Sequence, residues 1–292
     1  MVFLNPTSDI AFKKLFGNQA KTEILMSFLN SVLDRKEGEK ITKVTITDPN
    51  NNPDTKDLKY SIVDLRCTDQ AEKQYIIEVQ VKYQEDYPER VQHYVALAIA
   101  RQLKKAEKYK EIMPVIFIGV LSKPILESPH YTSHHNLRDV RTQEHALRHM
   151  DFHFIELSKF NKTLDELETV TDKWIYLLKN AEGLDSVPEQ LQSPIELEEA
   201  MDELQHGRLT VDQLEAYDRY LDARRVEQSV EDSLIKRSEE KGMQEGIEKG
   251  VRKGKEEMAH EIAKQLLDVL DIKTIAQKTG LSIEDVEKLK KG

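Results

Sequence analysis

The chain has 292 residues, of which 39% are hydrophobic and 33% charged, and its net charge at pH 7 is −10. This composition is typical of a soluble globular protein with much exposed helix, and it excludes binding of nucleic acid through overall charge. The single cysteine, Cys67, excludes an internal disulfide framework and a thiolate zinc cluster. No apolar run is long enough to cross a membrane and the N-terminus lacks a secretory pattern, so we expect a cytoplasmic protein.

Two amphipathic helices are predicted at the start of the chain. Thr7 or Ser8 can cap the first helix, and Gly17 can end it. Asp9 lies in the first turn, where it can either stabilise the helix dipole or take part in an active site. The second helix is indicated by apolar residues at helical spacing over residues 24–33.

Three strands are expected next. Residues 41–48 alternate loosely, and residues 61–65 and 75–82 form two further strand patterns. The short polar segment 69–73 between the last two is typical of a hairpin loop, which would make these strands antiparallel neighbours. In the strand over 75–82, alternate residues starting at Tyr75 form an apolar face that is expected to pack on the core.

The other face of that strand carries a row of polar side chains. Glu78, Gln80 and Lys82 are spaced by two residues, so they share one face. Asp64, on the neighbouring strand, can meet Glu78 side by side, and two carboxylates at one point suit a hard divalent cation. The alternative is that each acid lies on a solvated strand face.

The middle of the chain contains a predicted long helix over 86–110 and a buried strand over 113–121. The helix carries basic residues that form either a solvated face or a local phosphate-binding edge. These are Arg90, Arg101, Lys104, Lys105, Lys108 and Lys110. The continuous apolar run that follows predicts a strand buried on both faces.

Residues 122–149 are rich in proline and histidine and are expected to be a loop, with a last strand over 152–157. His145 and His149 are four residues apart, which would place them on one helix face. They could belong to a zinc site, but no nearby cysteine or acid completes it, and ordinary surface histidines are the alternative.

The C-terminal half has a helical pattern from about residue 164. Thr210 can cap a helix that leads into the very polar segment 227–260, where four glycines are spaced by four residues: Gly242, Gly246, Gly250 and Gly254. This segment is either a flexible linker or, as we favour, a long exposed helix that can self-associate. Residues 262–291 predict three short helices with a helix–turn–helix style turn at 279–282.

That C-terminal tail leaves two functions open. As a DNA reader it would present Glu284, Asp285 and Glu287 to phosphates, which is unfavourable. A small protein-interaction or end-capping element is the alternative. The expected organisation is an α/β core over 1–160, a helical extension over 161–226, a polar glycine-spaced helix or linker over 227–260, and a small helical tail over 261–292.

Several of these features together resemble a known family. They are Asp9, Phe12, Lys13 and Phe16 on the first helix, Asp64, the pair Glu78-x-Gln80, the helix over 86–110 followed by the strand from Pro114, and the glycine-spaced tail. In this combination the chain resembles the PD-(D/E)XK nuclease family transposases, also called Rpn recombination-promoting nucleases. The resemblance covers most of the chain, and residues 1–160 carry the better part of it.

The resemblance implies an α/β fold with a restriction-endonuclease-like core, a mixed central sheet flanked by helices, and a C-terminal helical extension. It also implies Mg²⁺-dependent cleavage of DNA, with Mn²⁺ or Ca²⁺ as alternative ions. By this resemblance Asp64, Glu78 and the backbone carbonyl of Val79 would bind the metal. Asp9 would approach it from the first helix.

The third position of the motif departs from many nucleases, which have lysine there. Gln80 cannot supply a positive charge to a developing oxyanion, and Lys82 on the same face is expected to substitute in part. The expected function is a metal-dependent DNA endonuclease linked to recombination or transposition, with self-association through the C-terminal helices. Two alternatives remain, a catalytically weak relative that serves as a DNA-binding or assembly module and a transcription factor that acts through the tail.

Overall fold

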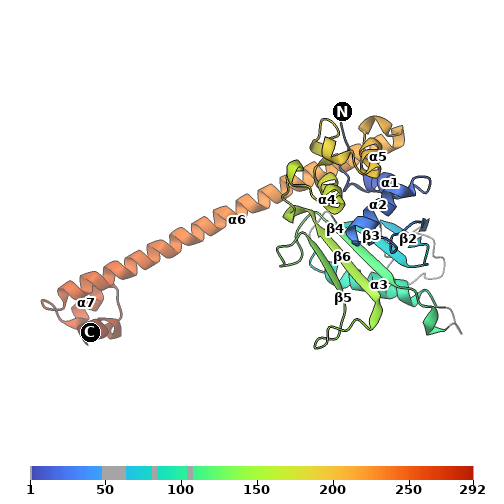
Figure 1. The fold of residues 1–292 in the computed structure, drawn as a ribbon. Helices are drawn as coiled ribbons and strands as arrows, with labels where there is room; N and C mark the ends of the chain where they lie inside the picture. Colours follow the sequence, from blue (N-terminus) through green and yellow to red (C-terminus); the bar gives the residue numbers. More distant parts are fainter. Residues whose placement is uncertain (1, 48–63, 81–83, 104–107, 292) are drawn as a thin grey trace. The chain divides into compact units, whose positions relative to one another are not determined.

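The computed structural model describes residues 2–47, 64–80, 84–103 and 108–291. The chain divides into two compact units, Met1–Tyr220 and Leu221–Gly292. The larger unit contains the whole sheet, and the smaller unit is helical (Figure 1). Within the described ranges, no helix combines the length and the apolar content that a bilayer span requires.

The sheet of the larger unit has six strands in the order β1-β2-β3-β4-β6-β5. Their bounds are β1 Val44–Thr47, β2 Leu65–Asp69, β3 Gln74–Gln80, β4 Val115–Leu121, β5 Thr132–Leu137 and β6 Leu147–Glu156. β4 pairs in parallel with β3 and β6, and the other neighbours are antiparallel, so the sheet is mixed. This confirms the predicted fold class and the antiparallel hairpin. The second strand, predicted over 61–65, is observed at Leu65–Asp69, and residues 61–63 and 81–82 of the predicted strands lie outside the described residues.

Helix α3 (Tyr87–Ala100) covers one face of the sheet. Val91, Val95 and Ala98 on the helix pack with Ile76, Phe117 and Leu121 on the strands. The helix is shorter than the prediction over 86–110. It ends at Ala100, and just beyond it the Gln102 side-chain amide bonds both backbone groups of Met113, at 2.7 and 3.0 Å.

Four helices of the same unit lie beyond the opposite face: α1 (Asp9–Phe16), α2 (Thr22–Val32), α4 (Val170–Asn180) and α5 (Ile195–Glu203) (Figure 1). Ser8 caps α1 and Gly17 ends it, as predicted. Phe16 and Phe28 pack against Trp174 of α4 in a tilted and an edge-to-face arrangement, with ring centroids 5.9 and 5.8 Å from that of Trp174. The helices after residue 160 therefore share a core with the first two helices.

The segment predicted as a loop over 122–149 contains strand β5 and the start of β6, so that prediction was wrong. His149 lies in β6, and no helix places it on one face with His145. The edge strand β5 was not predicted because its residues are polar except for Leu137. One of its histidines contacts the neighbouring strand, since His134 stacks on His153 of β6 with ring centroids 4.1 Å apart.

The helical unit begins within α6 (Val211–Leu266), a continuous helix of 56 residues. The predicted helix over 227–260 is thus confirmed, and Thr210 caps its start. The end of α6 packs with α7 (Ile272–Thr279) and α8 (Ile283–Lys291) around Ala263, Ile275 and Val286. Short 3-10 helices complete the chain: η1 Tyr109–Glu111, η2 Leu157–Lys159, η3 Leu164–Glu166, η4 Ala181–Gly183, η5 Glu189–Leu191 and η6 His206–Arg208.

Candidate active site

The β2–β3 hairpin sets Asp64 opposite Glu78. Leu65 pairs with Ile77 in the antiparallel register, and continuing this register by one residue makes Asp64 the partner of Glu78. Directly opposite residues point to the same face, with Cβ atoms about 5 Å apart. The predicted meeting of the two acids therefore follows from the register of the hairpin.

Asp64 is half-buried and is held by the neighbouring strand. Its Oδ2 accepts a hydrogen bond of 2.6 Å from the backbone N–H of Val79. Because the N–H and C=O of one strand residue point to the same side, the carbonyl of Val79 is also directed to the side of Asp64. Burial raises the pKa of Asp64, the bond from Val79 opposes this rise, and the charge of Asp9 adds to it.

Glu78 is buried, with 6% of its surface exposed, which excludes the solvated strand face considered above. Its Oε1 accepts a hydrogen bond of 2.9 Å from Nη2 of Arg90 on α3, while its Oε2 has no hydrogen-bond partner among the residues that the structure describes. Burial raises the pKa of Glu78 to about 7, the Arg90 guanidinium opposes this rise, and the Asp64 carboxylate adds to it. A nearby positive charge would stabilise the ionised form of such a buried carboxylate.

Other buried acids of the described ranges have structural partners instead. Asp69 accepts bonds from the Tyr75 hydroxyl and from two backbone N–H groups of its own hairpin. Glu156 accepts from two backbone N–H groups and pairs with Lys159. Glu78 thus differs from these acids in keeping one buried oxygen unsatisfied, and such an oxygen is costly unless a ligand occupies it.

Of the remaining predicted residues, the structure describes the side chain of Asp9 alone. Asp9 is largely exposed and pairs with Lys13 at 2.8 Å, so it reaches Asp64 through its charge. Gln80 is the last residue of β3, and its side chain lies outside the described part of the structure. Lys82 also lies outside the described residues, so its predicted role stays a prediction.

The oxygen atoms at this position suit an open site for Mg²⁺ better than a site in which protein side chains surround the metal completely. Within the described ranges no three His, Cys, Asp or Glu side chains form a group that could hold a metal ion. Mg²⁺ is commonly bound through one or two carboxylates, with water and substrate phosphate in its other positions. Asp64, Glu78 and the Val79 carbonyl are oxygen donors of the kind that such a site would use.

Two residues beside Glu78 were not predicted from the sequence. Tyr87, in the first turn of α3, packs its ring 5.0 Å from the Arg90 guanidinium. Gly119 of β4 pairs with Glu78 in the parallel register. A glycine within the apolar run 113–121 was the one available signal, because glycine in a strand often marks a close approach of another group.

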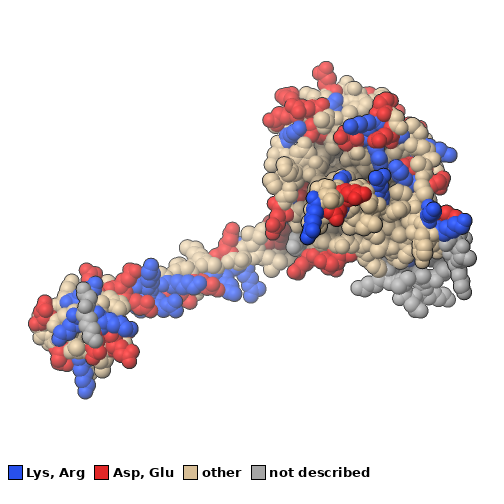
Figure 2. Space-filling model, turned by 60° about the horizontal axis from the view of Figure 1, so that its bottom comes forward, with Lys and Arg blue, Asp and Glu red and all other residues tan. Residues whose placement is uncertain are grey.

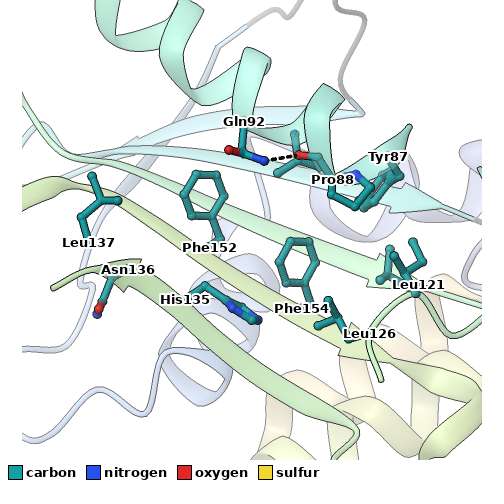
Figure 3. A pocket seen from close by; sticks show the side chains of 12 residues that line it. Tyr87, Pro88, Gln92, Leu121, Leu126, His135, Asn136, Leu137, Phe152 and Phe154 are labelled. Atoms are coloured by element: carbon teal, nitrogen blue, oxygen red, sulfur yellow. Dashed lines mark hydrogen bonds between the residues drawn. The ribbon is translucent and has the colours of Figure 1, made fainter. Parts of the chain in front are cut away.

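An apolar cavity of about 270 Å³ lies on the α3 side of the sheet (Figure 3). Phe152 and Phe154 of β6 point into it from below, and Tyr87 and Pro88 of α3 form part of its upper wall. Gln92 closes the helix side, where its amide donates a hydrogen bond of 3.1 Å to the carbonyl of Pro88. Tyr87 therefore lines the cavity while it also lies beside Glu78.

The surface visible in Figure 2 carries acidic and basic side chains close together, in the larger unit and along α6. Mixed charge of this kind is in keeping with the net charge of −10 and offers no broad positive face in that view. Attraction of a phosphate backbone would therefore depend on local groups, such as Arg90 and a cation held by the acid pair.

Comparison with known proteins supplies the identity of this fold. No curated protein and no solved structure gives a significant match to the chain. The family model described as PD-(D/E)XK nuclease family transposase matches residues 6–233, which include the whole sheet and the acid pair. The chain belongs to the PD-(D/E)XK nuclease family transposases.

Proposed function

We propose that this protein is a Mg²⁺-dependent DNA endonuclease that acts in recombination or transposition, with Mn²⁺ or Ca²⁺ as alternative ions. The single observation that carries the proposal is the unsatisfied buried oxygen of Glu78, opposite Asp64 in the hairpin register. Membership of a nuclease family supports the reaction class. In this proposal residues 1–160 carry the nuclease core, and the helices that follow support it or mediate self-association.

The proposed site residues divide the task among them. Asp64, Glu78 and the Val79 carbonyl would hold the cation, while Asp9 adds negative charge near Asp64. When bound, the cation polarises the scissile phosphate and lowers the pKa of a coordinated water. Arg90 places a guanidinium next to the acids, where it can interact with a DNA phosphate. Gln80 and Lys82 are proposed to contact the reacting groups from the end of β3.

A second function is favoured by one specific observation. Arg90 already occupies one oxygen of Glu78, and Gln80 stands where many nucleases have lysine. If this ion pair persists in the presence of metal and DNA, the same fold would bind DNA or assemble without cutting it efficiently. The protein would then be a DNA-binding or assembly module rather than an efficient endonuclease.

Nicking of supercoiled plasmid DNA in Mg²⁺ tests the two proposals. We expect the full chain to nick DNA, chelation with EDTA to stop the reaction, and Asp64→Ala to lower the rate about 100-fold or more, because a metal-binding carboxylate is lost. Asp222→Ala, at an exposed position on α6, is the matched control and should cleave as the wild type does.

The possible outcomes separate the two functions. Nicking that survives Asp64→Ala, in a variant whose circular dichroism is native, would refute cleavage at this site. Binding of DNA by the wild type, without metal-dependent nicking at any Mg²⁺ or Mn²⁺ concentration, would instead support the binding or assembly module.

A further inference from the structure

The hydroxyl group of Tyr87 is buried and has no hydrogen-bond partner. The residue is 1% exposed, and its Oη is among the few buried side-chain polar atoms of the described ranges that remain unsatisfied. Burying a hydroxyl without a partner costs free energy, and native structures seldom keep such a group without a reason. An explanation has to come from what surrounds the hydroxyl.

The Tyr87 hydroxyl lies next to the Cα atom of Gly119, where another residue would have its side chain. A Cβ atom added to Gly119 would lie 2.9 Å from Tyr87 Oη, so the hydroxyl occupies the volume that a side chain would fill. Gly119 is the register partner of Glu78 across β3 and β4, and neighbouring strands are about 4.8 Å apart. Tyr87 Oη therefore lies alongside the Glu78 side chain, on the same face of the sheet.

The two residues carry complementary unsatisfied atoms. Glu78 Oε2 is a hydrogen-bond acceptor without a partner, and the Tyr87 hydroxyl is a donor without a partner. Burial raises the pKa of Tyr87, and the negative charge of Glu78 raises it further, so the hydroxyl keeps its proton and remains a donor. A carboxylate oxygen has two acceptor positions, so Oε2 could accept a hydrogen bond from Tyr87 and still bind a cation.

We propose that Tyr87 is a positioning residue for Glu78, whose carboxylate it holds by a hydrogen bond when Glu78 and Asp64 share a divalent cation. This inference rests on the proposed function, because it assumes that these two acids bind the ion. Carboxylates that bind metals are commonly held by such a second hydrogen bond, and its loss weakens metal affinity about 10- to 100-fold. Arg90 donates to the other oxygen, Oε1, so it leaves Oε2 available to the Tyr87 hydroxyl.

The variant Tyr87→Phe tests the proposal, because it deletes the hydroxyl and keeps the ring. We expect its Mn²⁺ affinity, measured by isothermal titration calorimetry on the full chain, to fall about 10-fold or more. Its thermal midpoint without metal should stay the same or rise, since the deleted hydroxyl had no partner to lose. A purely structural Tyr87 would leave the Mn²⁺ affinity unchanged.

Tyr131→Phe is the matched control. The Tyr131 hydroxyl donates a bond of 2.9 Å to Asp172, so this variant should unfold at a lower temperature and bind Mn²⁺ normally. A second test is Gly119→Ala, whose methyl group would lie 2.9 Å from both the Tyr87 hydroxyl and the Phe154 ring and should also weaken Mn²⁺ binding. Its melting temperature is measured as well, because crowding of Phe154 lowers stability while loss of the Tyr87 bond alone does not.

Two negative results have different meanings. If the wild type binds Mn²⁺ in an Asp64-dependent way and Tyr87→Phe binds it equally well, the role of Tyr87 is refuted while the proposed nuclease stands. If the wild type shows no Asp64-dependent Mn²⁺ binding, the proposed metal-dependent function fails, and the inference about Tyr87 fails with it.

Discussion

The buried carboxylates Asp172 and Glu78 have pKa values shifted in opposite directions. Asp172 of α4 accepts hydrogen bonds from the Tyr131 hydroxyl and from Lys162, both at 2.9 Å. Burial alone would raise its pKa, but the bonds from Lys162 and Tyr131 outweigh burial and lower it. Glu78, with one oxygen unsatisfied, has its pKa raised instead. Satisfied acids stabilise the fold, whereas Glu78 is left able to gain a ligand.

This contrast predicts the effect of Asp172→Asn on stability. At pH 7 the variant should lose about 2–3 kcal/mol of unfolding free energy, because a charged hydrogen-bond acceptor is removed from a buried network. The folded pKa of Asp172 lies below its unfolded value of about 3.8, so this stability is fully present above pH 4. It is lost as pH falls through the folded pKa.

Urea denaturation of the wild type and Asp172→Asn at pH 7 and near pH 3 measures this difference. The gap between the two proteins should narrow at the lower pH. A gap of the same size at both pH values would show that the charge of Asp172 does not stabilise the fold.

At the scale of the elements, strong local patterns were sufficient to predict α1, β3, β4 and the β2–β3 hairpin. The edge strand β5 was missed because its residues are polar except for Leu137, so it shows no alternation of apolar and polar residues. The end of α3 was also missed, and the bonds between Gln102 and Met113 lie just beyond it. Local sequence carries neither of these signals.

In the candidate site, too, some residues could be predicted from local sequence and others could not. Asp64 and Glu78 could be predicted because a short hairpin brings them together within one stretch of sequence. Tyr87 and Gly119 reach Glu78 through the parallel pairing of β3 with β4, whose register depends on the crossover through α3. No periodicity in the sequence specifies that register.

The four glycines of α6 lead to a prediction about the element itself. A Cβ added at Gly242, Gly246, Gly250 or Gly254 meets no atom within 4 Å. Each Gly→Ala change should therefore stabilise the helix by up to about 1 kcal/mol, and circular dichroism should show a higher melting temperature. If the variant with all four changes melts at the same temperature as the wild type, the glycines do not weaken the helix.

The same variants test the proposed self-association. If two copies pack against each other through the glycines, alanine should weaken the association even as it favours the helix. Sedimentation of the wild type and the fourfold variant over a range of concentrations distinguishes this case. A monomeric wild type at all concentrations would contradict the proposed assembly.

For the whole molecule, the boundary between the two units lies within α6. The first turns of this helix belong to the larger unit, because Tyr217 is buried there and its hydroxyl accepts a bond of 2.8 Å from the backbone of Asn5. A cut before Val211 therefore removes Tyr217 from the larger unit, whereas a cut after Tyr220 keeps it.

We expect the fragment 1–220 to fold and to keep the Asp64-dependent nicking proposed for the full chain. The fragment 1–210 should be less stable by about 2 kcal/mol or more, because it loses a buried aromatic side chain and a hydrogen bond. Thermal melts and plasmid nicking of both fragments measure this. Loss of nicking in a folded 1–220 would show that cleavage needs the helical unit.

The first residues of the chain are joined to some of the last residues of the larger unit. Val2 and Leu4 exchange backbone hydrogen bonds with His206 and Leu204, at 2.9 and 2.8 Å, and Asn5 bonds Tyr217. During synthesis on the ribosome, which proceeds from the N-terminal side, the backbone bonds of Val2 and Leu4 cannot form until residues 204–206 have been made. A translating chain thus cannot complete these contacts of the larger unit before the segment that leads into α6 leaves the exit tunnel.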